Sequence, residues 1–326
     1  MSDNLKDINE NEVASNQSGE GEAVKLTGVK DVVTTSKKQL AVKIIVQIML
    51  YTFLVFMALI VLFPFYWMLI SSLKSLPEYN AAIPTLWPKK FIWGNYAEVF
   101  TNSSFNLGRL FLNTVVVGVV STLLSLVITI LAAFAFARLE FRGKNILFAA
   151  LLATMMIPGE MFTITNFITA SEFGWVHTEN AFNAYAALIV PFLVSVFYIY
   201  LLRQNFMQIP NELYLAAKVD GTSDFKYLWK VMVPLSAPTL ISITILKMMG
   251  AWNSYVWPRL VSNETFHLIT VGLRSNTDAF MDRATQMLNF PLQMAAVVVV
   301  TVPLLIVFLC FRKYIIRGVS RSGTKG

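Results

Sequence analysis

The residues of this 326-residue chain that are able to do chemistry are few and far apart. Its two histidines, His177 and His267, have no cysteine or carboxylate at the spacing of metal ligands, and its one cysteine, Cys310, lies in an apolar run. We find no Ser–His pair, no paired carboxylates and no other catalytic constellation in the sequence. The sequence therefore predicts a protein that is not an enzyme and that holds no metal or cofactor of its own.

Two charged residues, Glu160 and Lys247, interrupt otherwise apolar runs. Charge inside a membrane span is costly and marks a functional site by default, so these two residues are expected to pair or to line a solute pathway. The alternative is that Lys247 reaches the membrane surface and Glu160 faces water. Trp252 and Asn253 follow shortly after Lys247; an aromatic ring beside an amide suits a sugar, whereas aromatic clusters more often mark the membrane interface.

The elements that must position these residues are long apolar segments. Apolar residues make up 56% of the chain and charged residues 14%, against about 25% charged residues in soluble domains. About 20 apolar residues cross the ~30 Å hydrocarbon core as a helix, because lipid offers no partner for free backbone groups. We therefore predict an all-α integral membrane protein with six transmembrane helices. They cover about residues 44–73, 110–137, 145–167 (interrupted at Pro158 and Gly159), 184–202, 234–257 and 291–311.

The basic residues predict the orientation of these spans. Of the 26 Lys and Arg residues, 18 lie on the side that holds both termini, 7 lie on the other side, and Lys247 lies within a span. The positive-inside rule places the first side in the cytoplasm. The chain is then a multi-pass cell-membrane protein with a domain at residues 37–317, a disordered cytoplasmic tail at 1–36 and a short cytoplasmic tail at 318–326. The net charge of +7 follows from this bias and not from nucleic-acid binding, which would need a basic face interleaved with aromatic residues.

The segment between the fourth and fifth predicted spans, residues 203–233, is expected to form a cytoplasmic helix-turn-helix. Asn211 is a candidate cap for a first short helix, and Asp220-Gly221 supplies a turn in which glycine tolerates positive φ. Thr222 or Ser223 is a candidate cap for a second helix. That helix carries three residues predicted to share one face: Phe225, Leu228 and Trp229. The segment is thus predicted to be a compact projection from the membrane domain.

In this segment the sequence resembles the inner-membrane permeases of ATP-binding-cassette (ABC) importers, in the carbohydrate-uptake branch related to the maltose system. The family loop has Glu-Ala-Ala, two residues, Asp-Gly and then a hydrophobic helix that ends in Leu-Pro. The matching residues are Ala216, Ala217, Asp220, Gly221 and Pro234, with flanking matches at Arg203-Gln204, Pro210, Glu212 and Leu213. Leu215 stands where the family usually has Glu, and Thr222 where Ala is usual. The resemblance covers about residues 40–326 and includes residues 134–138, 156–158, 252–253 and 317–326.

The resemblance implies a permease that imports a sugar or a related small solute and that assembles with four other components. These are a second homologous permease, two ATP-binding subunits that use the ATP, and an extracytoplasmic solute-binding protein. It also implies that residues 203–233, which we call the coupling loop, dock on an ATP-hydrolysing subunit. The residues expected at that contact are Glu212, Tyr214, Leu215, Ala216, Ala217, Asp220 and Gly221. A secondary transporter is the alternative function, but it would need internal repeats and ion sites at mid-membrane depth.

Overall fold

The computed structural model describes residues 37–275, 277–282 and 285–320, and these ranges are helical apart from turns and one isolated bridge between Met281 and Leu288. The all-α prediction is therefore confirmed for the described part of the chain. The predicted N-terminal tail at residues 1–36 and the last six residues of the predicted C-terminal tail lie outside the described residues.

The chain forms two units, Met1–Ile60 and Val61–Gly326, which divide within the first helix, α1 (Lys37–Ser72). Residues 37–60 of the first unit are one continuous helical stretch. α1 continues through Pro64 in the second unit and ends beside a buried connection, where the Asn95 side chain donates hydrogen bonds to the Ser72 and Lys74 carbonyls. All the sites described below lie in the second unit.

Among the described residues, three helices are each long and apolar enough to cross a membrane: α1, α4 (Leu107–Arg138) and α15 (Phe290–Ser320). Three further candidates are pairs of shorter helical segments that bend sharply at a break. The first joins α5 (Lys144–Thr154) to the segment Gly159–Glu172, composed of η1 (Gly159–Phe162) and α6 (Thr163–Glu172), with a bend of 87°. The second joins Ala181–Phe192, composed of α7 (Ala181–Ile189) and η2 (Val190–Phe192), to α8 (Val196–Met207) with a bend of 54°. The third joins Asp224–Leu235 to α12 (Ala237–Asn253) with a bend of 79°.

Proline and extended backbone account for the breaks. The predicted interruption of the third span is confirmed, since α5 stops at Thr154 and Pro158 precedes the 3₁₀ turn η1. The fourth candidate span was expected to be one helix, but Pro191 lacks a backbone N–H and Ser195 is extended. The fifth was expected to run unbroken to residue 257. Instead, α12 ends at Asn253, Ser254 is extended, and the separate helix α13 (Val256–Val261) follows.

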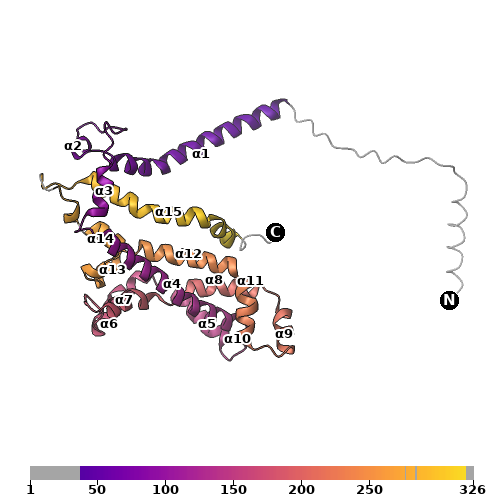
Figure 1. The fold of residues 1–326 in the computed structure, drawn as a ribbon. Coiled ribbons are helices and arrows are strands. Elements are labelled where there is room, and N and C mark those ends of the chain that lie inside the picture. The colour runs from indigo at the N-terminus through magenta and orange to yellow at the C-terminus, as the bar shows by residue number, and fades with distance from the viewer. Residues whose placement is uncertain (1–36, 276, 283–284, 321–326) are drawn as a thin grey trace, which may run out of the picture. The chain divides into compact units, whose positions relative to one another are not determined.

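α4 is the central helix of the second unit and packs against α7, α8, α12 and α14 (Figure 1). Its buried face is rich in small and hydroxylated side chains, which let neighbouring helices approach closely in a membrane. These are Thr114, Gly118, Ser121, Thr122, Ser125 and Thr129. A β-carbon at Gly118 would lie 3.3 Å from Met248 Sδ of α12, so the glycine sets the approach of these two helices.

Connections predicted as loops contain further short helices. They are α2 (Leu76–Tyr79), α3 (Gly94–Thr101), η4 (Glu264–Phe266), α14 (Ile269–Ser275) and η5 (Thr277–Phe280). α3 packs against α15, and α14 packs against α4 and α15. A buried cluster that includes Val99, Phe105 and Phe280 joins these connections to the ends of the long helices.

Candidate functional site

The coupling loop consists of two short helical segments separated by a tight turn. α9 (Asn211–Val219) is followed by Asp220 and by Gly221, whose φ of +70° is the left-handed conformation that the turn requires. The second segment is α10 (Asp224–Tyr227), the π-helical η3 (Leu228–Met232) and α11 (Val233–Leu235). In the structure, the tight turn at Asp220 and Gly221 thus separates α9 from the second helical segment.

The two predicted caps have different outcomes. The Ser223 hydroxyl accepts a hydrogen bond from the Lys226 backbone N–H at 3.4 Å, so the cap of the second helix is confirmed at Ser223. The prediction for Asn211 is wrong, because Pro210 occupies the cap position and Asn211 is the first helical residue. The Asn211 side chain is free for a different contact because it does not cap α9.

That contact is with Arg138, the last residue of α4. Its guanidinium donates hydrogen bonds to the Asn211 side-chain oxygen at 3.2 Å, to the Phe206 carbonyl at 2.9 Å and to the Ile209 carbonyl. Arg138 is buried although it is charged. The sequence argument included it in the family match at residues 134–138 but assigned it no contact. The three acceptors lie on both sides of Pro210, so one side chain fixes the route of the chain from α8 into α9.

Tyr214 was predicted to contact the ATP-hydrolysing subunit, and in the structure its side chain lies inside the coupling loop. Its side chain is 5% exposed and packs against Phe134 and Tyr227. Its hydroxyl donates a hydrogen bond of 2.8 Å to Asp224 Oδ1. Burial, together with the hydrogen bond to Asp224, raises the pKa of Tyr214 above its ordinary value, so the hydroxyl stays protonated. Tyr214 therefore joins the two helices of the coupling loop from the inside.

The outer surface of the coupling loop carries the other predicted contact residues. Glu212, Leu215, Ala216, Asp220 and Gly221 are exposed, and Ala217 is half-buried. Exposed apolar side chains also lie on this surface. Of these, the sequence argument listed Leu215 as a contact residue but not Val219 or Phe225. Leu215 is 54% exposed, Val219 88% and Phe225 65%. Leu228 was expected to share a face with Phe225 and Trp229. It is instead buried at 1% exposure, and only the two aromatic rings lie together, 6.1 Å apart.

Beneath this surface, one buried cluster connects the coupling loop to the membrane-domain helices. Tyr214, Tyr227, Leu228 and Met232 come from the loop. They pack with residues of three long elements: Ile130, Ala133 and Phe134 of α4, Leu202 and Phe206 of α8, and Ile243 of α12. Close-packed side chains therefore connect the coupling loop to α4, α8 and α12.

The second candidate site contains Lys247 of α12. Its amine donates a hydrogen bond to the Phe192 carbonyl at the break between α7 and α8 and lies 5.9 Å from the centre of the Tyr198 ring. Glu160 lies in η1 and is exposed. None of the described contacts joins Glu160 to Lys247. In the structure, the partner of Lys247 is therefore a backbone carbonyl.

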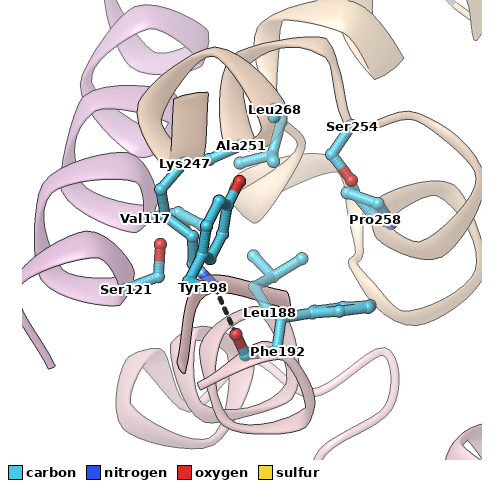
Figure 2. A pocket seen from close by; sticks show the side chains of 11 residues that line it. Val117, Ser121, Leu188, Phe192, Tyr198, Lys247, Ala251, Ser254, Pro258 and Leu268 are labelled. Carbon is cyan, nitrogen blue, oxygen red and sulfur yellow. Dashed lines mark hydrogen bonds between the residues drawn. The ribbon is translucent and has the colours of Figure 1, made fainter. Parts of the chain in front are cut away.

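Lys247 lines a cavity of about 300 Å³, shown in Figure 2. The walls come from α4, α7, η2, α8, α12 and α13 and are mainly apolar, with the polar groups of Ser121, Tyr198, Lys247 and Ser254 among them. Trp252 and Asn253, which were candidates for a solute contact or for the membrane interface, are not among the residues that line this cavity. Trp252 is buried against Phe111, and the Asn253 amide donates to the Met249 carbonyl.

The long apolar helices and the sharply bent helix pairs are features of the class of multi-pass membrane proteins. The model of the family described as binding-protein-dependent transport system inner membrane component matches residues 125–321. The chain belongs to this family. It is therefore a non-catalytic permease subunit of a binding-protein-dependent ABC transport system, held in the membrane by several apolar helices.

Relatives that match most of this chain are also named as transport system permease proteins. The arabinooligosaccharides transport system permease protein AraQ of Bacillus subtilis is 30% identical, with 86% of this chain and 96% of that protein covered. The trehalose/maltose transport system permease protein MalG of Thermococcus litoralis is 29% identical, with 87% and 99% covered. Among solved structures, a bacterial ABC transporter involved in import of the acidic polysaccharide alginate has a chain that is 25% identical with a TM-score of 0.72. That match covers 86% of this chain and 98% of the other.

Proposed function

We propose that the chain is one of two homologous permease subunits of an ABC importer that carries a sugar or a related small solute into the cell. Two ATP-hydrolysing subunits and an extracytoplasmic solute-binding protein complete the proposed assembly. The family match supports the use of a binding protein, and the saccharide-transport names of the relatives support the solute class. ATP is used by the partner subunits, and no cofactor is assigned to this chain.

The proposed topology has six spans with both termini and the coupling loop in the cytoplasm. The three long helices and three bent pairs support six crossings, if each pair is one span. In the third pair, α12 is taken as the crossing segment and residues 224–233 as part of the coupling loop. The excess of Lys and Arg on the side of the loop and termini supports the orientation.

The observation that carries the proposed mechanism is the buried cluster under the coupling loop. The exposed surface formed by Leu215, Val219 and Phe225 is proposed to dock on the ATP-hydrolysing subunit. When that subunit moves on nucleotide binding, Tyr214 and Tyr227 pass the movement to α4, α8 and α12 because they are close-packed against them. Arg138 holds the loop on the end of α4, so the loop and the helix move together.

The turn at Gly221 provides the experiment. Gly221→Val forces a β-branched residue into positive φ and is expected to distort the turn. Gly143→Val is the matched control, because Gly143 also has positive φ, +81°, and open space around it, but lies outside the coupling loop. Gly221→Val should lower both the co-purification of the ATP-hydrolysing subunits and the uptake of labelled arabinotriose, maltose or glycerol 3-phosphate. Unimpaired assembly and uptake in Gly221→Val would contradict the proposal.

A further inference from the structure

The cavity of Figure 2 is unusual in its charge. Lys247 is the one charged side chain among the described residues that line it, and none of those residues is acidic. An ammonium group has three N–H donors, and the hydrogen bond to the Phe192 carbonyl uses one of them. Within this cavity, the Lys247 ammonium group therefore has N–H donors available, and the described residues that line the cavity provide no acidic partner for it.

An intramembrane cation of this kind is costly unless a function or a partner offsets the cost. Glu160, the other charge within a predicted span, is exposed on η1 and makes no described contact with Lys247. The carbonyl of Phe192 is a neutral acceptor and leaves the positive charge unbalanced. An anionic group that entered the cavity would supply the missing charge.

The backbone around Lys247 also points to a site for a polar ligand. Two helix breaks form part of the wall, one at residues 192–195 between η2 and α8 and one at Ser254 between α12 and α13. Non-helical backbone at membrane depth is tolerated where it is buried in protein or lines a polar cavity. Both breaks contribute residues to this one space, Phe192 and Ser254.

The remaining walls suit a small sugar ring. The Tyr198 ring and the apolar side chains of Val117, Leu188 and Leu268 offer surface to C–H groups. The hydroxyl groups of Tyr198, Ser121 and Ser254 offer donors and acceptors around the same space (Figure 2). A volume of about 300 Å³ is at the small end of ligand pockets, which fits one sugar unit better than a long oligosaccharide within the cavity itself.

We propose that this cavity binds a negatively charged group, a carboxylate or a phosphate ester, on the sugar that the importer carries, with Lys247 as the binding cation. The inference rests on the proposed function and adds the substrate class: a uronate or a sugar phosphate. The anionic group would accept a hydrogen bond from the Lys247 amine. Membrane lipid headgroups carry the same anionic chemistry, so the experiment must separate the two sources.

The experiment uses the intact transporter, purified through a tag on this chain and reconstituted in phosphatidylcholine nanodiscs. Calorimetric titrations compare galacturonate with galactose, mannuronate with mannose, and glucose 6-phosphate with glucose. The expected result is tighter binding of the charged member of at least one pair.

Lys247→Met should weaken that binding about tenfold or more, the loss expected for one charge-assisted hydrogen bond. Lys247→Arg should retain the preference for the charged sugar because it retains the charge. Lys90→Met, which removes an exposed charge outside the cavity, should bind like the wild type.

Three outcomes would overturn the proposal. They are equal binding of charged and neutral sugars, unchanged binding by Lys247→Met, and no binding in any pair.

A second experiment tests lipid as the source of the anion: it adds phosphatidylglycerol to the nanodiscs and measures retained lipid by native mass spectrometry. Phosphatidylglycerol retained by the wild type but lost from Lys247→Met, without preference for a charged sugar, would assign the anion to lipid and reject the solute. Uptake of the charged sugars at wild-type rates by Lys247→Met would reject this inference and leave the proposed importer function standing.

Discussion

The Arg138 guanidinium donates a hydrogen bond to the Asn211 side-chain oxygen at 3.2 Å and so joins the last turn of α4 to the first turn of α9. The same guanidinium holds the Phe206 and Ile209 carbonyls, which lie where α8 ends and the coupling loop begins. One buried cation thus connects two membrane-domain helices and the loop. We interpret it as the fixed point about which the loop is positioned.

Arg138→Leu should destabilise this junction. The substitution removes the donor of the Ile209 carbonyl and of the Asn211 side-chain oxygen, and one of the two donors of the Phe206 carbonyl. A buried acceptor left without a donor costs about 1–3 kcal/mol. We expect a loss of about 2–4 kcal/mol in the free energy of unfolding, measured as a lower melting temperature in detergent, together with reduced co-purification of the ATP-hydrolysing subunits. Arg142→Leu removes an exposed charge nearby and should change the melting temperature little.

Arg138→Lys distinguishes geometry from charge at the same position. Lysine keeps the positive charge but lacks the planar fork of donors that reaches three acceptors. The variant should therefore lose part of the stability and part of the assembly. A lysine variant as stable and as well assembled as the wild type would show that the charge alone is sufficient and that the fork of the guanidinium is not required.

The sequence predicted the elements of the coupling loop better than its internal contacts. Gly221 and Ser223 were predictable because a turn glycine and a cap serine act on their own backbone neighbourhood. Arg138 and Tyr214 were not, because their partners lie in other elements. Arg138 and Asn211 are 73 positions apart, and no local pattern marks which of several basic residues will be buried.

The difference between local signals and contacts among distant elements also explains which features of the membrane domain could be predicted from the sequence. Apolar runs located the candidate spans, and Pro158 and Gly159 marked the break in the third. The breaks at Ser195 and Ser254 have no comparable signal at the residue itself, since serine is common within membrane helices. Their positions become clear only where Phe192, Ser254 and Lys247 meet around one cavity.

Tyr214→Phe tests the inner connection of the coupling loop. The substitution keeps the ring in its buried cluster and removes the hydrogen bond to Asp224. Because the acceptor is a carboxylate, we expect a loss of about 1.5–3 kcal/mol in stability. The melting temperature should fall while the phenylalanine variant retains the fold by circular dichroism. If Tyr214→Phe matches the wild type in melting temperature, this hydrogen bond does not stabilise the loop.

Val219→Ser and Phe225→Ser test the outer surface of the coupling loop. Both side chains are strongly exposed, so their removal from the isolated chain should change its stability by no more than about 0.5 kcal/mol. Each should nevertheless weaken co-purification of the ATP-hydrolysing subunits, because buried apolar area at the docking surface is lost. Met156→Ser is a control, since Met156 is 85% exposed but lies outside the loop. Equal loss of assembly in all three variants would argue against a docking surface on the loop.

His267 is predicted to make the stability of the second unit depend on pH. Burial, with the Arg259 charge nearby, lowers the pKa of His267 below its ordinary value, and its Nδ1 lies 2.9 Å from the Ser262 hydroxyl. A histidine whose pKa is lower in the folded state contributes its full stability above its unfolded pKa of about 6.5. That contribution falls as the pH drops below this value, because the unfolded chain then binds the proton more readily.

His267→Gln should therefore reduce the fall in melting temperature between about pH 7 and pH 5, because glutamine cannot take up a proton there. His177→Asn is the matched control, since His177 is exposed and asparagine tolerates its positive φ of 49°. The measurement is a series of thermal unfolding curves across this pH range for the three proteins. An acid-dependent loss of the same size in His267→Gln and in the wild type would mean that other groups cause it.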